Sequence, residues 1–275
     1  MEKFQIQNGV LVKYMGDDTC VTVPEGVRVI GGGAFSKCKS LQKIIIPEGV
    51  CMIRDFAFCN CKNLQEIDFS SSVHSVVGGY VFAGCKNLRT INIDPKNPYF
   101  SSEEGFLFNK SKTVLLYMFQ RKETVSVPDG VEYISIYAFR AQDFFDVITL
   151  PDSVTEIAEG AFMGCPNLCE FIISPNNPYF SYEDGILYGK NKTQILFCRG
   201  DKEGDVHIPD SVIEICDWAF ACCDIQSITI PDSVISTGEF VFGRREQLKT
   251  VRLSKNSTLT EEDLCLPENC ELVRI

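Results

Sequence analysis

The sequence is poor in histidine and in basic residues. Two His and one Trp occur in 275 residues, and 26 Lys and Arg stand against 37 Asp and Glu, which gives a formal net charge of −11. Because nucleic-acid phosphates and anionic membranes both select basic surfaces, we expect neither nucleic acid nor a membrane surface as a partner. The chain also lacks a run of about 18 apolar residues, and its first residues lack the basic and apolar regions of a signal peptide. These absences predict a soluble chain without membrane insertion and without a leader.

Metal and cofactor sites are not indicated either. The 14 cysteines form no C-x-x-C knuckle of the kind that a zinc ribbon needs. The closest cysteine pairs are Cys59/Cys61 and Cys222/Cys223. His74 and His207 lie in valine-rich, strand-like segments, which favours structural roles over metal binding. No G-x-x-x-x-G-K-[ST] phosphate loop is present, so we predict neither a metal nor a cofactor.

The sequence also offers no catalytic group in a typical context. His207 and Cys216 share one coil, but neither lies in a nucleophile turn such as G-x-S-x-G. Many carboxylates sit directly after a proline, where a type I turn accounts for them without acid-base chemistry. These carboxylates are Glu48, Asp129, Asp152, Asp210 and Asp232. The chain is therefore predicted not to be an enzyme.

The chain contains one unit of about 23 residues that recurs seven times, with the pattern P-[ED]-[GS]-V-x-x-I-x-x-x-A-F-x-x-C-x-x-L-x-x-I-x-I. The copies begin at Pro24, Pro47, Ser70, Pro128, Pro151, Pro209 and Pro231. Their phenylalanines share one slot, at Phe35, Phe58, Phe82, Phe139, Phe162, Phe220 and Phe242. A repeat of this length is typical of leucine-rich repeats, in which each unit forms one coil of a solenoid.

Each repeat is predicted to form one strand, after which turns bring the chain back to the start of the next coil. In L-x-x-I-x-I the apolar residues recur with the two-residue period of a strand, so that Ile44 and Ile46 point inward and Ile45 points outward. Stacked coils then form a parallel concave sheet, and proline ends each strand. Short helical or 3-10 turns carry the chain back, and the shared phenylalanines stack in one column. The predicted fold class is a β-rich leucine-rich-repeat solenoid.

Two matching segments interrupt the repeats, residues 94–127 and 174–208. Each contains N-P-Y-F-S, two strand-like runs and a polar turn, which predicts a β-hairpin inserted into the solenoid. The expected organisation of one solenoid domain, residues 1–275, is an N-terminal capping hairpin (1–23), repeats (24–93, 128–173 and 209–253), the two hairpins and a C-terminal cap (254–275).

The cysteines of the repeat share one slot. They are Cys38, Cys61, Cys85, Cys165 and Cys223, with Gln142 and Arg245 in the remaining copies. A buried slot in a tight coil favours a small side chain with weak polar capacity, so packing is a better explanation than reactivity. A redox sensor would instead show several fast-reacting thiols. Disulfides between neighbouring coils remain an open alternative.

At these motifs the chain resembles the BspA-type leucine-rich repeat family, over about residues 4 to 253. The resemblance covers both the I-P-[ED]-[GS]-V-x-x-I-x-x-x-A-F-x-x-C coil and the N-P-Y-F-S-x-E-[DE]-G-x-L insertion. It implies a right-handed α/β superhelix and a role in adhesion and protein binding on the surface of host-associated bacteria and some protozoa. The thiol content and the missing leader indicate the cytoplasm instead, so the localisation stays open.

The predicted function is non-catalytic recognition of a protein partner, such as a host surface or extracellular protein. The expected binding residues on the concave face are Lys43, Glu66, Asp68, Asn92, Glu170 and Arg252. The alternative is a structural scaffold that self-associates through its terminal coils or hairpins. Arg199-Gly200-Asp201 matches a tripeptide that engages integrins on exposed loops, but so short a motif arises easily by chance.

Overall fold

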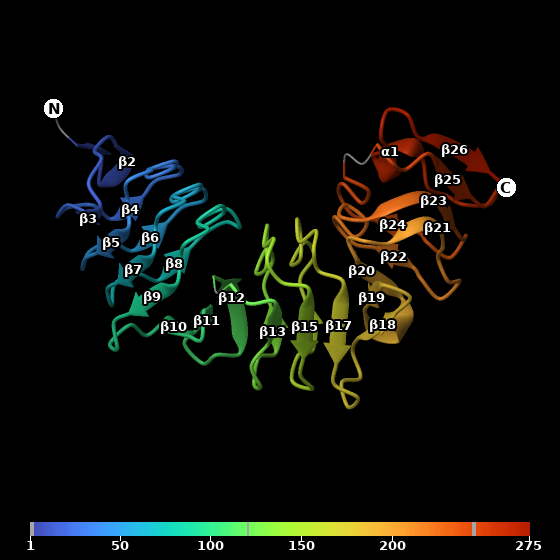
Figure 1. Ribbon diagram of the computed structural model, residues 1–275, viewed down its shortest axis with the longest axis horizontal. Helices are drawn as coiled ribbons and strands as arrows, with labels where there is room; N and C mark the ends of the chain where they lie inside the picture. The colour runs from blue at the N-terminus through green and yellow to red at the C-terminus, as the bar shows by residue number, and fades with distance from the viewer. Residues whose placement is uncertain (1–2, 120, 244–245) are drawn as a thin grey trace. The chain divides into compact units, whose positions relative to one another are not determined.

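The computed structural model describes residues 3–119, 121–243 and 246–275 (Figure 1). Arg245, which shares the slot of the repeat cysteines, lies outside the described residues. The chain divides into two compact units, unit 1 (residues 1–121) and unit 2 (residues 122–275), which are considered separately below. Within each unit, consecutive coils stack so that their strands lie side by side, as expected for a repeat solenoid.

Unit 1 consists of strands joined by turns. Its strands are β1 (Phe4–Gln7), β2 (Val10–Tyr14), β3 (Cys20–Thr22), β4 (Val29–Ile30), β5 (Lys43–Ile46), β6 (Met52–Ile53), β7 (Glu66–Phe69), β8 (Ser75–Val76), β9 (Thr90–Ile93), β10 (Phe100–Glu103), β11 (Phe106–Asn109) and β12 (Val114–Met118). The strands of three or four residues form the sheet β3-β5-β7-β9, and the two-residue strands continue the N-terminal hairpin in the sheet β1-β2-β4-β6-β8. Each coil therefore contributes one strand to each of two sheets.

The register of the parallel strands follows the repeat. Ile44 of β5 pairs with Ile67 of β7, which pairs with Ile91 of β9, and all three side chains are buried. The residues between them alternate to the outer face, as the pleat of a strand requires. One repeat of sequence thus becomes one step across the sheet, and the same residue type returns to the same place in each coil.

The shared phenylalanines form the predicted column. In unit 1 the ring centroids of Phe35 and Phe58 lie 5.4 Å apart, and those of Phe58 and Phe82 lie 5.9 Å apart, with nearly parallel planes. The ring of Tyr14 from the N-terminal hairpin covers Phe35 at 5.3 Å. Because all four rings are buried, the column places a large apolar area in the core of every coil.

The proline turns differ in type from the expectation. Pro47 ends β5 and its carbonyl accepts a hydrogen bond from the Val50 amide, but Gly49 at the third position has a φ of 98°. A positive φ at this position is the mark of a type II turn, which favours glycine. Gly26 and Gly130 occupy the same position with φ of 83° and 90°. The predicted type I turn is therefore wrong in the copies that carry glycine.

Unit 2 repeats this architecture. Its strands are β13 (Thr124–Ser126), β14 (Tyr133–Ile134), β15 (Val147–Leu150), β16 (Glu156–Ile157), β17 (Glu170–Ile173), β18 (Ser181–Glu183), β19 (Ile186–Tyr188), β20 (Gln194–Cys198), β21 (Glu203–His207), β22 (Glu214–Ile215), β23 (Asp224–Ile230), β24 (Ser236–Thr237), β25 (Thr250–Leu253) and β26 (Glu271–Arg274). The strands that correspond to β3, β5, β7 and β9 of unit 1 form two parallel sheets, β13-β15-β17 and β21-β23-β25-β26. Unit 2 has an aromatic column of its own, in which Phe139 stacks on Phe162 with ring centroids 5.2 Å apart.

Helix is almost absent from the described residues, which contain the 3-10 helix η1 (Lys190–Lys192) and the short helix α1 (Glu261–Leu264). The return segments of the repeats are tight turns with hydrogen bonds of the 3-10 type, as predicted, and they do not lengthen into regular helices. In the first copy, for example, the Ser36 amide donates to the Gly33 carbonyl and the Cys38 amide donates to the Phe35 carbonyl. The coil is too short to close these bonds into a helix of more than one turn.

The two inserted hairpins are present, and a buried asparagine anchors each of them. β10, β11 and β12 pair antiparallel in unit 1, and β18, β19 and β20 do so in unit 2. In the N-P-Y-F segment of unit 2 the Asn177 amide donates to the carbonyls of Pro151 and Val154, at 2.8 and 2.9 Å, and its oxygen accepts from the Tyr179 amide. Asn97 makes the corresponding bonds in unit 1. Each asparagine therefore supplies hydrogen bonds to the backbone carbonyls in the turn of the preceding coil.

Candidate binding surfaces

Four of the six predicted binding residues form one cluster on the outer face of β5, β7 and β9. The Lys43 ammonium contacts Glu66 Oε1 and Asp68 Oδ2, each at 2.8 Å. From the next strand, the Asn92 amide donates to Glu66 Oε1 and to Asp68 Oδ1, each at 2.7 Å. The parallel register creates this arrangement because it places Lys43 beside Glu66 and Asp68 beside Asn92. We refer to Lys43, Glu66, Asp68 and Asn92 as the strand-face network.

The electrostatics of the strand-face network favour its charged form. Hydrogen bonds to Asp68 and Glu66 raise the pKa of Lys43 above its ordinary value. Partial burial raises the pKa of Asp68, but the hydrogen bonds from Lys43 and Asn92 outweigh this effect and hold it below its ordinary value. With one ammonium and two carboxylates, the cluster carries a net charge of −1. About a third of each charged side chain remains exposed, so a partner can reach it.

A hollow adjoins one end of the strand-face network. It has a volume of about 330 Å³ and is lined by Asn92, Asp94, Phe100, Ser101 and Lys110, among others. Its walls come from β9 and the residues after it, from β10 and from Lys110 after β11, so the insertion shapes the surface beside the network. The polar and mixed lining suits hydrogen bonding to a polypeptide better than the enclosure of an apolar small molecule.

The other two predicted residues lie on two different sheets of unit 2. Glu170 projects from β17 beside Val147 of β15 and is exposed. Arg252 of β25 donates from Nη1 to the Ser227 hydroxyl at 2.7 Å, and that hydroxyl donates to Asp205 Oδ1 at 2.5 Å. The structure therefore joins Arg252 to a chain of polar contacts across β21, β23 and β25, whereas it does not join Glu170 to that chain.

Asp205 was missed by reasoning from the repeat. It lies on β21, which follows the second inserted hairpin, so its segment does not carry the leucine-rich pattern from which the outer-face positions were aligned. The usable signal was the alternation in E-G-D-V-H-I-P, which places Asp205 and His207 on one face and Val206 on the other.

The repeat cysteines act in the core as hydrogen-bond donors. The thiols of Cys61, Cys85 and Cys165 donate to the carbonyl of the shared phenylalanine one coil earlier, at 2.9, 3.1 and 2.9 Å. A hydrogen bond with Cys38 lowers the pKa of the Cys61 thiol, but a hydrogen bond with Cys85 and burial raise it to about 12. All fourteen cysteines lie within the described residues and carry thiols rather than disulfides. A thiol of this kind is a poor nucleophile.

The histidines lie apart from the core of the repeats. His207 is exposed on β21, whereas Cys216 of the same repeat is buried, and burial raises the pKa of the Cys216 thiol. His74 is also exposed and its ring lies 5.5 Å from that of Tyr99 in the first inserted segment. Within the part of the chain that the structure describes, no group of three or more His, Cys, Asp and Glu side chains could hold a metal ion.

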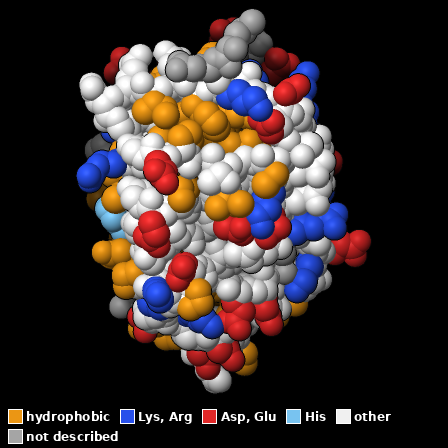
Figure 2. All heavy atoms as spheres, turned by 90° about the vertical axis from the view of Figure 1, so that its left-hand side faces the viewer, with side chains coloured by type: hydrophobic (Ala, Val, Ile, Leu, Met, Phe, Trp, Pro, Cys, Tyr) orange, Lys and Arg blue, Asp and Glu red, His pale blue; other side chains and the backbone are white. Residues whose placement is uncertain are grey.

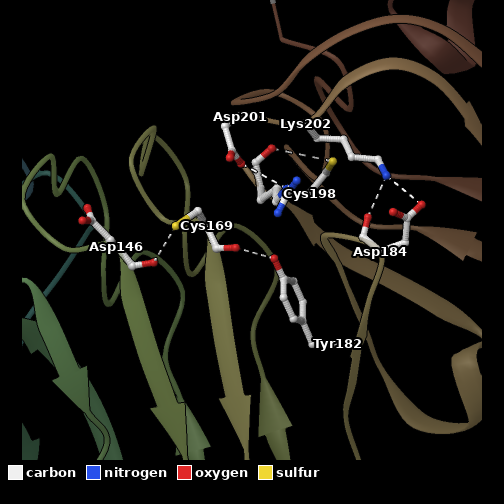
Figure 3. A network of polar contacts seen from close by, with 8 residues as sticks. Asp146, Cys169, Tyr182, Asp184, Cys198, Asp201 and Lys202 are labelled. Atoms are coloured by element: carbon white, nitrogen blue, oxygen red, sulfur yellow. Dashed lines mark hydrogen bonds and ion pairs between the residues drawn. The ribbon is translucent and has the colours of Figure 1, made fainter.

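The tripeptide Arg199-Gly200-Asp201 is folded onto itself. Arg199 Nε lies 3.1 Å from Asp201 Oδ1, so the two charged side chains pair with each other, and the adjacent Lys202 pairs with Asp184 at 2.7 Å (Figure 3). Gly200 is buried, and a Cβ at this position would lie 1.9 Å from the Pro166 carbonyl oxygen. This segment serves to return the chain from the second hairpin to the next coil, where only glycine fits.

Hydrophobic and charged side chains mix on the N-terminal side of the molecule. Figure 2 shows this side, on which hydrophobic side chains gather in one area and acidic and basic side chains are interspersed around it. The N-terminal hairpin contributes exposed apolar side chains, with Ile6, Val12 and Met15 exposed to 41%, 36% and 59%. No helix among the described residues is long and apolar enough to cross a membrane.

Nearly the whole chain is similar to a known family of repeat proteins. A family model for the BspA type leucine rich repeat region matches in six copies, over residues 14–115, 112–199 and 194–275. No curated protein matches the sequence. Among solved structures, the chain is similar to a leucine rich cell surface protein from Faecalibacterium prausnitzii, with 25% identity and a TM-score of 0.58, over 90% of this chain and 61% of that protein.

A second similar structure is that of a leucine-rich repeat protein from Eubacterium ventriosum. Its sequence is 20% identical, the TM-score is 0.52, and the match covers 94% of this chain and 74% of that one. At this identity the likeness concerns the fold alone. The chain spans less than two thirds of the length of the Faecalibacterium protein.

Proposed function

The chain belongs to the family of BspA-type leucine-rich repeat proteins, and we propose that it is a non-catalytic module that binds a protein partner through its strand faces. The partner that this proposal implies is a surface or extracellular protein, and the role is adhesion. Support comes from the repeat family and from the cell-surface protein of similar structure. The residues proposed to make contact are the strand-face network, Glu170 and Arg252.

The strand-face network is the single observation that carries this proposal. Its four side chains are exposed enough to be touched, yet each is held by two contacts of 2.7 to 2.8 Å. A surface whose side chains are already ordered loses less conformational entropy when a partner binds. The carboxylate oxygens of Glu66 and Asp68 keep lone pairs that can accept further hydrogen bonds.

Binding to a panel of purified extracellular proteins tests this proposal. We expect the wild-type chain, immobilised on a biosensor, to bind at least one of them, and the double variant Lys43→Ala/Asp68→Ala to bind that protein at least about tenfold more weakly. Lys112→Ala/Glu103→Ala removes another exposed ion pair, on the first hairpin, and is the matched control. Equal binding by the wild type and the strand-face variant would refute a role for this surface.

A self-associating scaffold is the second candidate, and the exposed apolar side chains of the N-terminal hairpin favour it. β3 and β26 also lie at the ends of their sheets, where unpaired backbone groups offer an edge to another copy. Sedimentation velocity over a range of concentrations discriminates between the two functions. A scaffold requires association that Ile6→Ser/Met15→Ser weakens, and a concentration-independent monomer contradicts it.

A further inference from the structure

A row of aromatic side chains follows the turns of unit 2. It occupies the slot two residues before the shared phenylalanine of each repeat, where Tyr137, Gly160, Trp218 and Phe240 stand in successive copies. The rings of Trp218 and Phe240 stack with centroids 4.9 Å apart and planes inclined by 25°. A Cβ on Gly160 would lie 3.2 Å from the Tyr137 ring and 4.0 Å from the Trp218 ring, so the three rings follow one another across this glycine.

The backbone of this slot does not favour aromatic residues. Tyr137, Trp218 and Phe240 have φ angles of 62°, 61° and 51°, in the left-handed region that is unfavourable for bulky side chains. Gly160 stands in the same slot with a φ of 68°. Phe240 is 42% exposed and Trp218 is only partly buried, so core packing does not explain why aromatic residues occupy strained positions. Strain of this kind often marks a functional surface.

Carboxylates border the aromatic row. Glu159, Asp217 and Glu239 each precede the row position by one residue. The Asp217 amide donates to Glu159 Oε2 at 3.2 Å, and the Glu239 amide donates to Asp217 Oδ1 at 2.5 Å, so the acidic side chains of neighbouring coils are close together. Burial raises the pKa of Glu159, and the negative charge of Asp217 adds to this effect. A cation placed here would relieve the repulsion between the two carboxylates.

The net charge of unit 2 also favours the binding of a cation. Unit 2 contains twelve Lys and Arg against twenty-six Asp and Glu, a formal charge of −14, whereas unit 1 contains fourteen against eleven, a charge of +3. Unit 1 has a comparable stack, in which the rings of Phe56 and Tyr80 lie 4.5 Å apart beside Asp55. The two stacks share their architecture and differ in the charge around them, so charge complementarity singles out the row in unit 2.

We propose that the turn edge of unit 2 binds a lysine- or arginine-rich segment of a protein partner, whose cationic groups lie on the Trp218 and Phe240 rings and beside Glu159 and Asp217. A cation over an aromatic face is attracted by the negative charge of the ring, most strongly for tryptophan. The carboxylates supply the opposite charge for the same group. This surface lies in the turns and not on the strand faces, so it stands or falls independently of the proposed function.

Trp218 is the only tryptophan of the chain, so its fluorescence reports on this surface directly. We expect titration with an octalysine peptide to change the emission of Trp218 in a saturable way and to protect it from quenching by acrylamide. An octaglutamate peptide should have no effect. The absence of any change on addition of octalysine would overturn the proposal.

Variants separate this site from general attraction to an acidic protein. With fluorescein-labelled octalysine, Trp218→Gly and Asp217→Asn should each lower the affinity about tenfold. Phe56→Gly makes the same kind of change in the unit 1 stack, and Glu271→Gln removes one charge from β26, so both controls should bind like the wild type. Because glycine is favoured at a positive φ, the relief of backbone strain in Trp218→Gly offsets the loss of the stack with Phe240, so we expect the variant to stay folded with a melting temperature close to that of the wild type. A loss of binding then does not come from unfolding.

A different ligand at the turn edge of unit 2 would give different results in these binding experiments. Octalysine that binds Trp218→Gly and Asp217→Asn as tightly as the wild type would show attraction to net charge alone and overturn the proposal. A Trp218 response to a neutral oligosaccharide such as maltohexaose, without one to octalysine, would identify a saccharide site instead. Salt-sensitive self-association that Trp218→Gly abolishes would show that the occupant is the basic unit 1 of a second copy, which also contradicts a foreign partner.

Discussion

The thiol of Cys61 donates a hydrogen bond to the carbonyl oxygen of Phe35, 2.9 Å away and one coil earlier. Both residues are fully buried, and the same carbonyl also accepts a hydrogen bond from the Cys38 amide of its own coil. The same bond links Cys85 to Phe58 and Cys165 to Phe139. In these three copies the recurring cysteine is therefore both a small residue of the coil and an additional hydrogen-bond donor to the phenylalanine one coil earlier, whereas Cys223 donates to Phe220 of its own coil.

Replacing Cys61 by alanine should destabilise unit 1. The change removes the thiol hydrogen bond to the Phe35 carbonyl, which keeps its bond from the Cys38 amide, and it opens a small void. We therefore expect a loss of about 1 kcal/mol in the free energy of unfolding. Urea denaturation measures this loss. Cys20→Ala, at an exposed cysteine of β3, is the control and should be neutral. Equal stability of the two variants would show that the thiol bond contributes nothing.

Replacing Asn177 by alanine should lower the free energy of unfolding more than Cys61→Ala does. Its side chain satisfies the buried carbonyls of Pro151 and Val154 in the preceding coil and the amide of Tyr179. The Pro151 carbonyl keeps its bond from the Val154 amide, so the loss of Asn177 leaves the Val154 carbonyl and the Tyr179 amide without this partner. We expect a cost of about 3 kcal/mol in the free energy of unfolding, measured by urea denaturation. The neighbouring Asn176 is exposed, and Asn176→Ala should cost little. A cost below that of the control would contradict the anchoring role of Asn177.

The pKa of Asp68 should depend on Lys43. In the folded chain the pKa of Asp68 lies below its ordinary value of about 3.9, so its ionisation stabilises the fold above that value, and this stabilisation is lost as the pH falls through the folded pKa. Carboxyl NMR of Asp68 should show a higher pKa in Lys43→Gln than in the wild type. Lys112→Gln, which alters an ion pair on the hairpin, should leave the pKa of Asp68 unchanged. An unchanged pKa in Lys43→Gln would contradict the strand-face network.

Gly200 should not tolerate a side chain. The Cβ of Gly200→Ala would lie 1.9 Å from the Pro166 carbonyl oxygen, so the backbone must shift, and we expect a loss of about 3 kcal/mol in thermal or urea unfolding. Gly204→Ala is the matched control, because nothing lies within 4 Å of its Cβ and only its φ of 78° opposes the change, at about 1 kcal/mol. If Gly200→Ala were no worse than this control, the segment would be less tightly packed than the structure indicates.

The sequence predicts the coil and not the contacts between distant segments. The recurrence of Phe35, Phe58 and Phe82 at nearly equal spacing is enough to predict their stacking, because identical coils place identical side chains above one another. The same reasoning put Lys43 beside Glu66, and the register agrees. The turn type in P-E-G-V was predicted wrongly, since the positive φ of glycine selects type II there.

Tertiary structure alone decides which side chains meet where the repeat is interrupted. Asp205 approaches Ser227 only because the second hairpin returns the chain to β21, and Asp217 reaches Glu159 across 58 residues of sequence. Gly200 likewise packs closely against the carbonyl of Pro166, which belongs to an earlier coil. A periodic pattern specifies the environment of a residue in its own coil, whereas contacts between unrelated segments depend on the path of the whole chain. The sequence by itself therefore determined the repeating core and the neighbours within the repeated strands, and the tertiary structure decided the contacts where the repeat is interrupted.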